Sequence, residues 1–141
     1  MHFRFFIFLL ITSSFGPAAA QSIDFGDDSG EWAQDGECDD PRFEGPGMTS
    51  TPLIFDDLKR DASDCLAAFE QGLLSLRGVS ADGQIDFGVD GGDWSNNGEC
   101  NDMRFEGPAM TEVILLFEDI MQDATDCSAA FDAGQLKLAA D

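Results

Sequence analysis

The chain has 141 residues and carries 28 acidic against 7 basic side chains, which gives a formal net charge of -21. Such a charge repels phosphate backbones and anionic lipid, so nucleic-acid binding is disfavoured and cationic partners are favoured. Hydrophobic residues still make up 43% of the chain, which predicts a folded protein, and the single histidine, His2, excludes His-dependent catalysis and His-ligated zinc from the rest of the sequence.

Residues 1–20 have the layout of a secretory signal peptide. A basic start at Arg4 is followed by an apolar run from Phe5 to Ile11, and then by small residues that end at Ala20. The apolar run is shorter than the roughly 20 helical residues that a membrane span needs. We therefore predict cleavage after Ala20 and a mature protein that is periplasmic or secreted, with no membrane span.

The rest of the chain is one unit written twice. Residues 23–76 align without a gap with residues 85–138, at an offset of 62, and 31 of the 54 pairs are identical. A repeated unit of this length is expected to form the same structure in both copies. We divide the chain into the signal peptide, a first module (21–76), a linker (77–84) and a second module (85–141).

Each module is predicted to be a small α+β unit stapled by a disulfide, with a short strand, an acidic loop, one or two short helices and a closing strand. Residues 23–25 alternate apolar and polar side chains, as do residues 74–76, so we expect these two segments to pair. One helix is expected to begin near Thr51. A second is expected between an N-cap at Ser63 and a stop at Gly72.

The four cysteines are spaced 27 positions apart within each module, as Cys38 with Cys65 and Cys100 with Cys127. In an exported chain an even, duplicated set of cysteines predicts disulfides, and four cysteines allow three pairings. Duplication favours the pairing within each module, which is worth on the order of 3 kcal/mol. A four-cysteine metal site is disfavoured, because the paired C-x-x-C spacing is absent.

The acidic loops predict a cation site. Calcium takes six to eight oxygen ligands from carboxylates and carbonyls. The predicted disulfides bring each loop close to the acidic residues that follow it, so we expect a Ca²⁺ site in each module, formed by Asp40, Asp57, Asp61 and Asp64 and by Asp102, Asp119, Asp123 and Asp126. Because Asp35 and Asp39 correspond to Asn97 and Asn101, the tighter site is expected in the first module.

A second interpretation of the same cluster needs no metal. Arg42 and Arg104 each lie among the carboxylates and can pair with them in a fork. The chain would then be an extracytoplasmic interaction module for a cationic protein or a cell-envelope partner. Trp32 and Trp94 are assigned to the core with the phenylalanines. We predict that the protein is not an enzyme, because a unit this small offers little room for a substrate cleft.

Two strings carry a resemblance to known sequences. W-x-x-[DN]-G-E-C-[DN]-D-x-R-F-E-G-P, followed by D-A-[ST]-D-C-x-A-x-F-x-x-G, resembles short acidic modules that recur in exported bacterial proteins, sometimes beside peptidase-like domains. The strings cover both modules. The resemblance implies an exported, modular protein, and it does not imply a specific activity. Over a few residues the chain is also similar to Excalibur-type extracellular calcium modules, with their acidic D-G-x-x-C-E signature.

Overall fold

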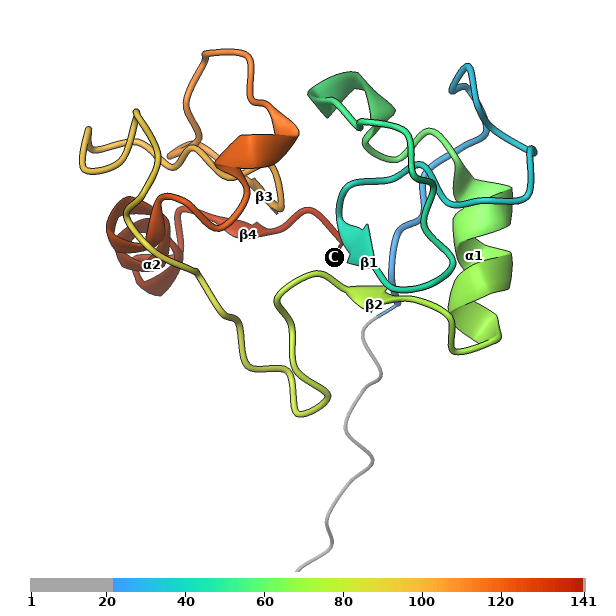
Figure 1. The fold of residues 1–141 in the computed structure, drawn as a ribbon. Helices are drawn as coiled ribbons and strands as arrows, with labels where there is room; N and C mark the ends of the chain where they lie inside the picture. The colour runs from blue at the N-terminus through green and yellow to red at the C-terminus, as the bar shows by residue number, and fades with distance from the viewer. Residues whose placement is uncertain (1–21, 141) are drawn as a thin grey trace, which may run out of the picture.

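The computed structural model describes residues 22–140, so the predicted signal peptide lies outside the described residues. The two repeats form two α+β units side by side, each with its helix on the outside (Figure 1). The first contains β1 (Phe43–Glu44), the 3₁₀-helix η1 (Phe55–Asp57), α1 (Ala62–Glu70) and β2 (Ser75–Leu76). The second contains β3 (Phe105–Glu106), η2 (Phe117–Asp119), α2 (Ala124–Asp132) and β4 (Lys137–Leu138). The predicted fold class is confirmed.

Disulfides join Cys38 to Cys65 and Cys100 to Cys127, as the duplication predicted. Each bond ties the acidic loop to the first turn of the module's α-helix. All four cysteines are completely or almost completely buried. The disulfides therefore sit at the centre of each module and fix the loop against the helix.

A cluster of three phenylalanine rings packs beside each disulfide. In the first module the rings of Phe25 and Phe43 stack with centroids 5.4 Å apart, and both meet the ring of Phe69 edge-on. The second module repeats this cluster at the equivalent positions. Trp32 and Trp94, which we expected in the core, are instead 48% and 50% exposed. The three rings and the disulfide are thus the main apolar core of a module this small.

The strand pairing differs from the expected one. The closing strand β2 is present, but it pairs antiparallel with β1, which places Phe43 opposite Leu76. The backbone at Asp24, inside the expected opening strand, instead donates its N–H to the carbonyl of Ala140 in the second module, at 2.8 Å. The predicted opening strand over residues 23–25 is therefore wrong: this segment forms no strand, and its backbone contacts a distant part of the chain instead.

The helices also differ in detail from the prediction. α1 forms where expected, but it begins after Asp61, and the amide and hydroxyl of Ser63 donate to the carboxylate of Asp28 at 2.8 and 2.6 Å. The helix expected near Thr51 is reduced to η1, since the preceding Ile54 forms an antiparallel bridge with Leu116 of the other module. Pairing between the modules thus overrides the local preference for helix at this place.

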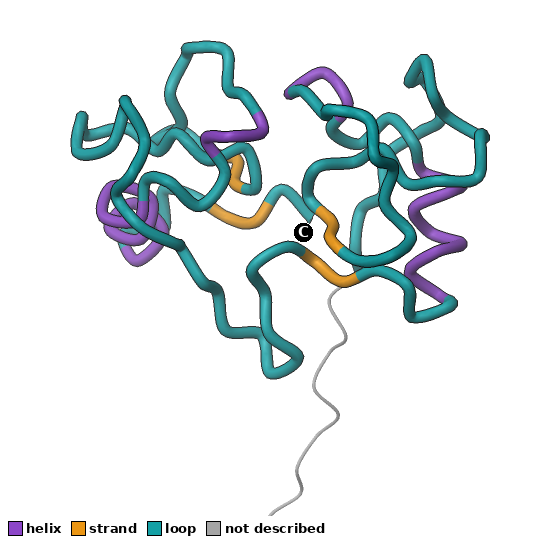
Figure 2. Tube along the Cα trace, in the orientation of Figure 1, coloured by secondary structure: helices purple, strands orange, loops and turns teal. Residues whose placement is uncertain are grey.

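The two modules hold each other through reciprocal contacts near the centre of the molecule, where the strand pairs lie (Figure 2). Arg42 donates to the carbonyl of Ala139, at 2.9 Å, and Arg104 donates to the carbonyl of Arg77, at 3.2 Å. Donors and acceptors in these two bonds are related by the same offset of 62. The modules are therefore arranged about an approximate twofold axis, and the segment after each closing strand completes the other module.

Candidate functional site

A buried ion pair lies at the base of each acidic loop. The Nε atom of Arg42 donates to both carboxylate oxygens of Asp40, at 3.0 and 2.9 Å, and both side chains are at most 2% exposed. The same carboxylate accepts the backbone N–H groups of Arg42 and Lys59, each at 3.0 Å. With this many donors, the carboxylate of Asp40 has no oxygen to offer a metal, and its role is to hold the loop in place.

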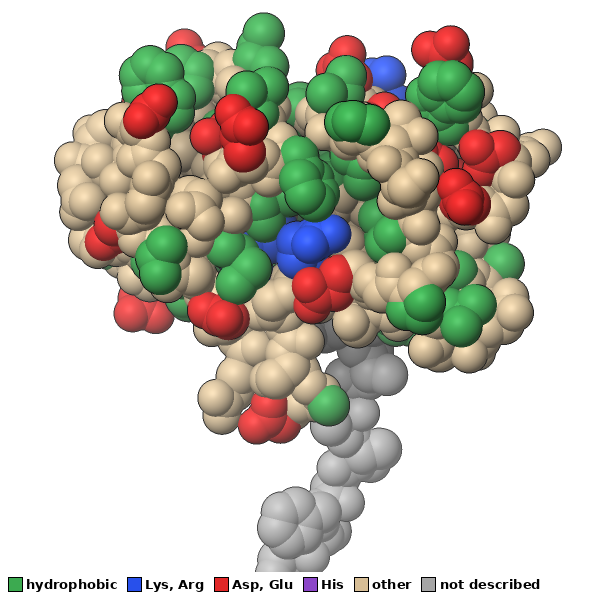
Figure 3. All heavy atoms as spheres, in the orientation of Figure 1, with side chains coloured by type: hydrophobic (Ala, Val, Ile, Leu, Met, Phe, Trp, Pro, Cys, Tyr) green, Lys and Arg blue, Asp and Glu red, His purple; other side chains and the backbone are tan. Residues whose placement is uncertain are grey.

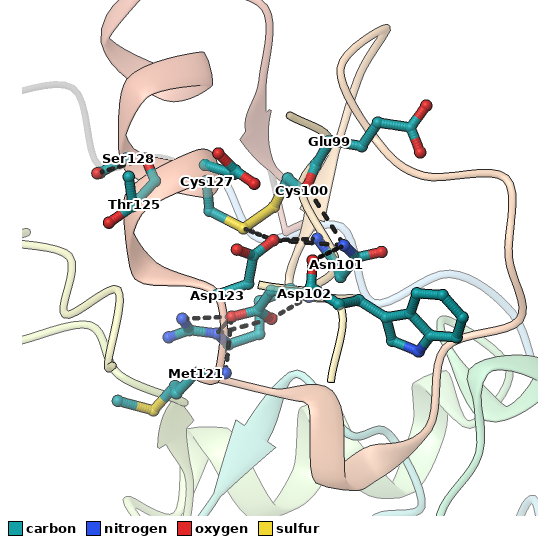
Figure 4. The surroundings of a disulfide bond; sticks show 12 residues. Glu99, Cys100, Asn101, Asp102, Met121, Asp123, Thr125, Cys127 and Ser128 are labelled. Carbon is teal, nitrogen blue, oxygen red and sulfur yellow. Dashed lines mark hydrogen bonds and ion pairs between the residues drawn. A yellow bond between two sulfur atoms is a disulfide. The ribbon is translucent and has the colours of Figure 1, made fainter. Parts of the chain in front are cut away.

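The second module contains the same ion pair. Arg104 Nε donates to both oxygens of Asp102 at 3.1 and 2.9 Å, and Met121 N–H donates to that carboxylate at 2.9 Å (Figure 4). The expected Arg–carboxylate pairs are therefore present in both modules. Asp40 and Asp102, two of the eight aspartates predicted to bind calcium, have their oxygens occupied by these pairs.

Asp61 and Asp39 form a second buried acidic group, beside the disulfide of the first module. One carboxylate oxygen of Asp61, Oδ2, accepts the backbone N–H of Asp39 at 2.8 Å. The remaining oxygen, Oδ1, and Oδ2 of Asp39 are buried without any hydrogen-bond donor. The two side chains are only 2% and 4% exposed, so solvent does not replace the missing donors.

The residues that carry these oxygens line a small cavity. It has a volume of about 10 Å³ and is lined by Asp39, Asp57 and Asp61, by the exposed Arg60, and by the loop residues Gly30, Glu31, Trp32 and Ala33. A volume near 10 Å³ accommodates about one water molecule or one ion. Four acidic residues, Glu31 among them, thus line a space that admits a single small occupant.

The electrostatics of the group follow from this crowding. Burial, together with the charges of Asp35 and Asp61, raises the pKa of Asp39 from 3.8 to about 6. Burial is also the main reason why the pKa of Asp61 is raised, while the hydrogen bond from the Asp39 amide opposes this shift. A buried carboxylate without a counter-charge destabilises the fold, so either a proton or a cation at this place would stabilise it.

The second module shows how an amide changes the same place. Asn101 stands where the first module has Asp39, and its Nδ2 group donates to the carbonyls of Trp94 and Glu99, both at 3.3 Å (Figure 4). Its backbone N–H donates to Asp123 at 2.9 Å. Asp39 has no such side-chain donor. The amide of Asn101 therefore adds a donor for two carbonyls that Asp39 cannot supply, although Asn101 Oδ1 and Asp123 Oδ1 remain buried without a hydrogen-bond donor, like Asp39 Oδ2 and Asp61 Oδ1.

The remaining predicted ligands serve local structure. Asp64 and Asp126 accept the backbone N–H of Gly36 and Gly98 at 2.8 Å, so they fasten the loops to the helices. The carboxylates of Asp57 and Asp119 accept backbone N–H groups at the start of η1 and η2, at 2.8 and 2.7 Å. Of the four residues expected in the first module, Asp57 and Asp61 are brought together at the cavity, and Asp40 and Asp64 are used elsewhere.

Asp39 is not among the ligands predicted from the sequence, although the difference between Asp39 and Asn101 was the basis for expecting tighter binding in the first module. The signal that identifies it is this same contrast, since an Asp-to-Asn difference at a buried position changes the available donors. Cys38 and Cys65 lie within 4.8 Å of Asp61 as well, but their sulfur atoms are bonded to each other and do not act as thiolate ligands.

Comparison with known proteins adds no assignment: no family model, curated protein or solved structure matches this chain. Within residues 22–140, no helix has the length and apolar character needed to cross a membrane.

Proposed function

We propose that the protein is a non-enzymatic, periplasmic or secreted tandem module whose first module binds Ca²⁺ between Asp39 and Asp61. The observation that carries this proposal is that Asp39 and Asp61, each with one buried carboxylate oxygen that lacks a hydrogen-bond donor, line the same small cavity. Two disulfides in a chain with a signal-like leader support the extracytoplasmic location.

A cation explains the group better than a water molecule or a proton does. A water molecule can donate to two carboxylates, but it leaves their charges uncompensated. A proton neutralises Asp39 only below its pKa of about 6, so the carboxylate is ionised at neutral pH. Carboxylates and carbonyls are hard oxygen ligands, which favour Ca²⁺ over metals that prefer nitrogen or sulfur.

The ligand set differs from the one that the sequence suggested. Asp39 and Asp61 supply the oxygens without donors, and Asp57 lines the same cavity. The carbonyls of Trp32 and Glu37 correspond to those that contact Asn101 in the second module, so they are the backbone ligands we assign. Extracellular calcium modules have dissociation constants on the order of 0.1–1 mM, and we expect an affinity in this range.

The second module is expected to bind Ca²⁺ more weakly. Asn101 removes one negative charge, and its amide already satisfies the two carbonyls. Because ligand charge is a main determinant of calcium affinity, this single difference ranks the two modules. Arg60 lines the cavity of the first module without forming an ion pair among the described residues, so replacing it by the Gln found at position 122 should strengthen binding.

Calorimetric titration of the chelator-treated protein tests the proposal. We expect one dominant Ca²⁺ site and a rise in melting temperature, since a ligand of the native state stabilises it. Asp39→Asn should remove the dominant site, and Asn101→Asp should add a second one of similar affinity. Absence of both heat and a melting shift at millimolar Ca²⁺ would refute the proposal.

A further inference from the structure

The approximate symmetry of the molecule is broken at one position next to the contact between the modules. Arg77 follows β2, and the equivalent residue after β4 is Ala139. Their backbones are placed identically, because each donates its N–H to the carbonyl of the buried arginine in its own module, at 2.8 Å. The first module therefore provides a guanidinium at a place where the second provides only a methyl group.

The guanidinium of Arg77 occupies a defined site. It lies over the ring of Phe117, with the Cζ atom 4.9 Å from the ring centroid. It also donates to the carbonyls of Pro41 and Phe43, at 3.0 and 2.6 Å, and its Nη1 atom is 3.8 Å from the carboxylate of Glu44. An aromatic ring and a carboxylate around a planar cation form a favourable guanidinium site.

The equivalent place in the other half is a groove. The counterparts of Phe117, Phe43 and Glu44 are Phe55, Phe105 and Glu106, and all three line a depression of about 350 Å³. The lining continues along the apolar segment before η2, residues 110–115. Phe55 is 46% exposed and Ile114 is 84% exposed, so a large apolar surface faces solvent here. Monomeric soluble proteins seldom leave such a surface uncovered without a partner.

Charge identifies the kind of partner. Glu112 lies in the lining, and neighbouring Asp56 and Glu118 are exposed. No Lys or Arg among the described residues forms an ion pair with these three carboxylates. Figure 3 shows hydrophobic side chains exposed where the modules meet, with a basic side chain and acidic groups beside them. At a net charge of -21, a second copy of the chain would be repelled from this surface.

We propose that this groove binds an arginine side chain carried by an apolar segment of a cationic partner protein, with the guanidinium over Phe55 as Arg77 lies over Phe117. Glu106 is already 2.8 Å from Lys137 and 3.5 Å from Lys59, so Glu112 supplies the main unpaired charge. Apolar neighbours of the arginine pack along residues 113–115. The groove shares no residue with the cation cavity, but η1 contributes Phe55 to the groove and Asp57 to the cavity.

Peptide titration tests the proposal. Two peptides, acetyl-Gly-Leu-Arg-Leu-Gly-amide and its lysine analogue, are added to the full protein, and binding is followed in amide-resolved NMR spectra. We expect the arginine peptide to shift the amides of residues 105–116 and to bind about tenfold more tightly than the lysine peptide, because only the planar guanidinium stacks on the ring. Equal affinity for both peptides would overturn the proposal. So would shifts spread over the whole acidic surface.

Two matched variants separate the groove from general surface charge. Phe55→Ala should weaken the arginine peptide about tenfold, whereas Phe117→Ala, the equivalent ring already covered by Arg77, should leave the affinity unchanged. Glu112→Gln should weaken binding about threefold without removing the ring. The dispersion of the amide spectrum verifies that each variant is folded. Equal effects of the two Phe variants, or shifts that depend on protein concentration without peptide, contradict an arginine partner.

Discussion

Replacing Asp39 by Asn should make the calcium-free protein more stable at neutral pH. The carboxylate of Asp39 is 4% exposed, and its pKa is raised from 3.8 to about 6. A raised pKa means that the native state holds the charged form less favourably than the unfolded chain does. Two pKa units correspond to about 3 kcal/mol. In the second module Asn101 already occupies this environment, with its amide bonded to two carbonyls, so the replacement has a structural precedent.

The sign of the pH dependence follows from the same shift. Below about pH 4, Asp39 is protonated in both states, and the variant and the natural protein should differ little. As the pH rises through 4 to 6, the unfolded chain loses its proton first, and the natural protein loses stability that the Asn variant keeps. Above about pH 6 the difference reaches its full size.

Urea unfolding in the presence of a chelator, followed by circular dichroism between pH 3 and pH 8, measures this difference. A stabilisation of about 3 kcal/mol at pH 8 that vanishes by pH 4 is the expected result. The reverse variant, Asn101→Asp, should lower stability over the same pH range. If Asp39→Asn has no effect, or destabilises the chelator-treated protein at pH 8, then the buried charge of Asp39 does not destabilise the native state as we infer.

Three further outcomes concern the second module. Replacing Cys100 and Cys127 together by Ser should lower the free energy of unfolding by about 3.5 kcal/mol, measured by urea unfolding, because the disulfide closes a loop with a sequence separation of 27. Arg104→Met should cost about 3–5 kcal/mol by leaving the carboxylate of Asp102 buried and unpaired, and adding Asp102→Asn should restore part of the loss in a double-mutant cycle. The pKa of Asp90 is lowered by its hydrogen bonds with the hydroxyl and amide at the start of α2, so Asp90→Ala should lower the melting temperature at neutral pH and lose this effect as the pH falls below 3.8.

Features that depend on spacing along the chain were predictable from the sequence. The repeat, the disulfide pairing and the existence of α1 follow from an offset of 62, a cysteine separation of 27 and local helix signals. Each of these is specified within one module. They account for the fold class, and they required no knowledge of how the modules contact each other.

Features that depend on contacts between the modules were not predictable in this way. The partner of residues 23–25 is the end of the chain, and Ile54 leaves the helical pattern because it pairs with Leu116. The acidic cluster illustrates the same limit for the site. Composition gathers many carboxylates into one loop, but only the three-dimensional arrangement gives Asp40 an arginine and leaves Oδ2 of Asp39 without a donor.

The two modules differ at two pairs of equivalent positions that affect different surfaces of the molecule. At one pair of equivalent positions, Asp39 and Asn101, the first module has the charge that favours a cation. At another pair, Arg77 covers the ring of Phe117, whereas Ala139 leaves the matching groove at Phe55 open. Since the exchanged backbone contacts are the same in both halves, these side-chain differences change the surfaces without changing the fold. The proposed cation site and the proposed guanidinium site can therefore be tested by different substitutions, Asp39→Asn for the first and Glu112→Gln for the second.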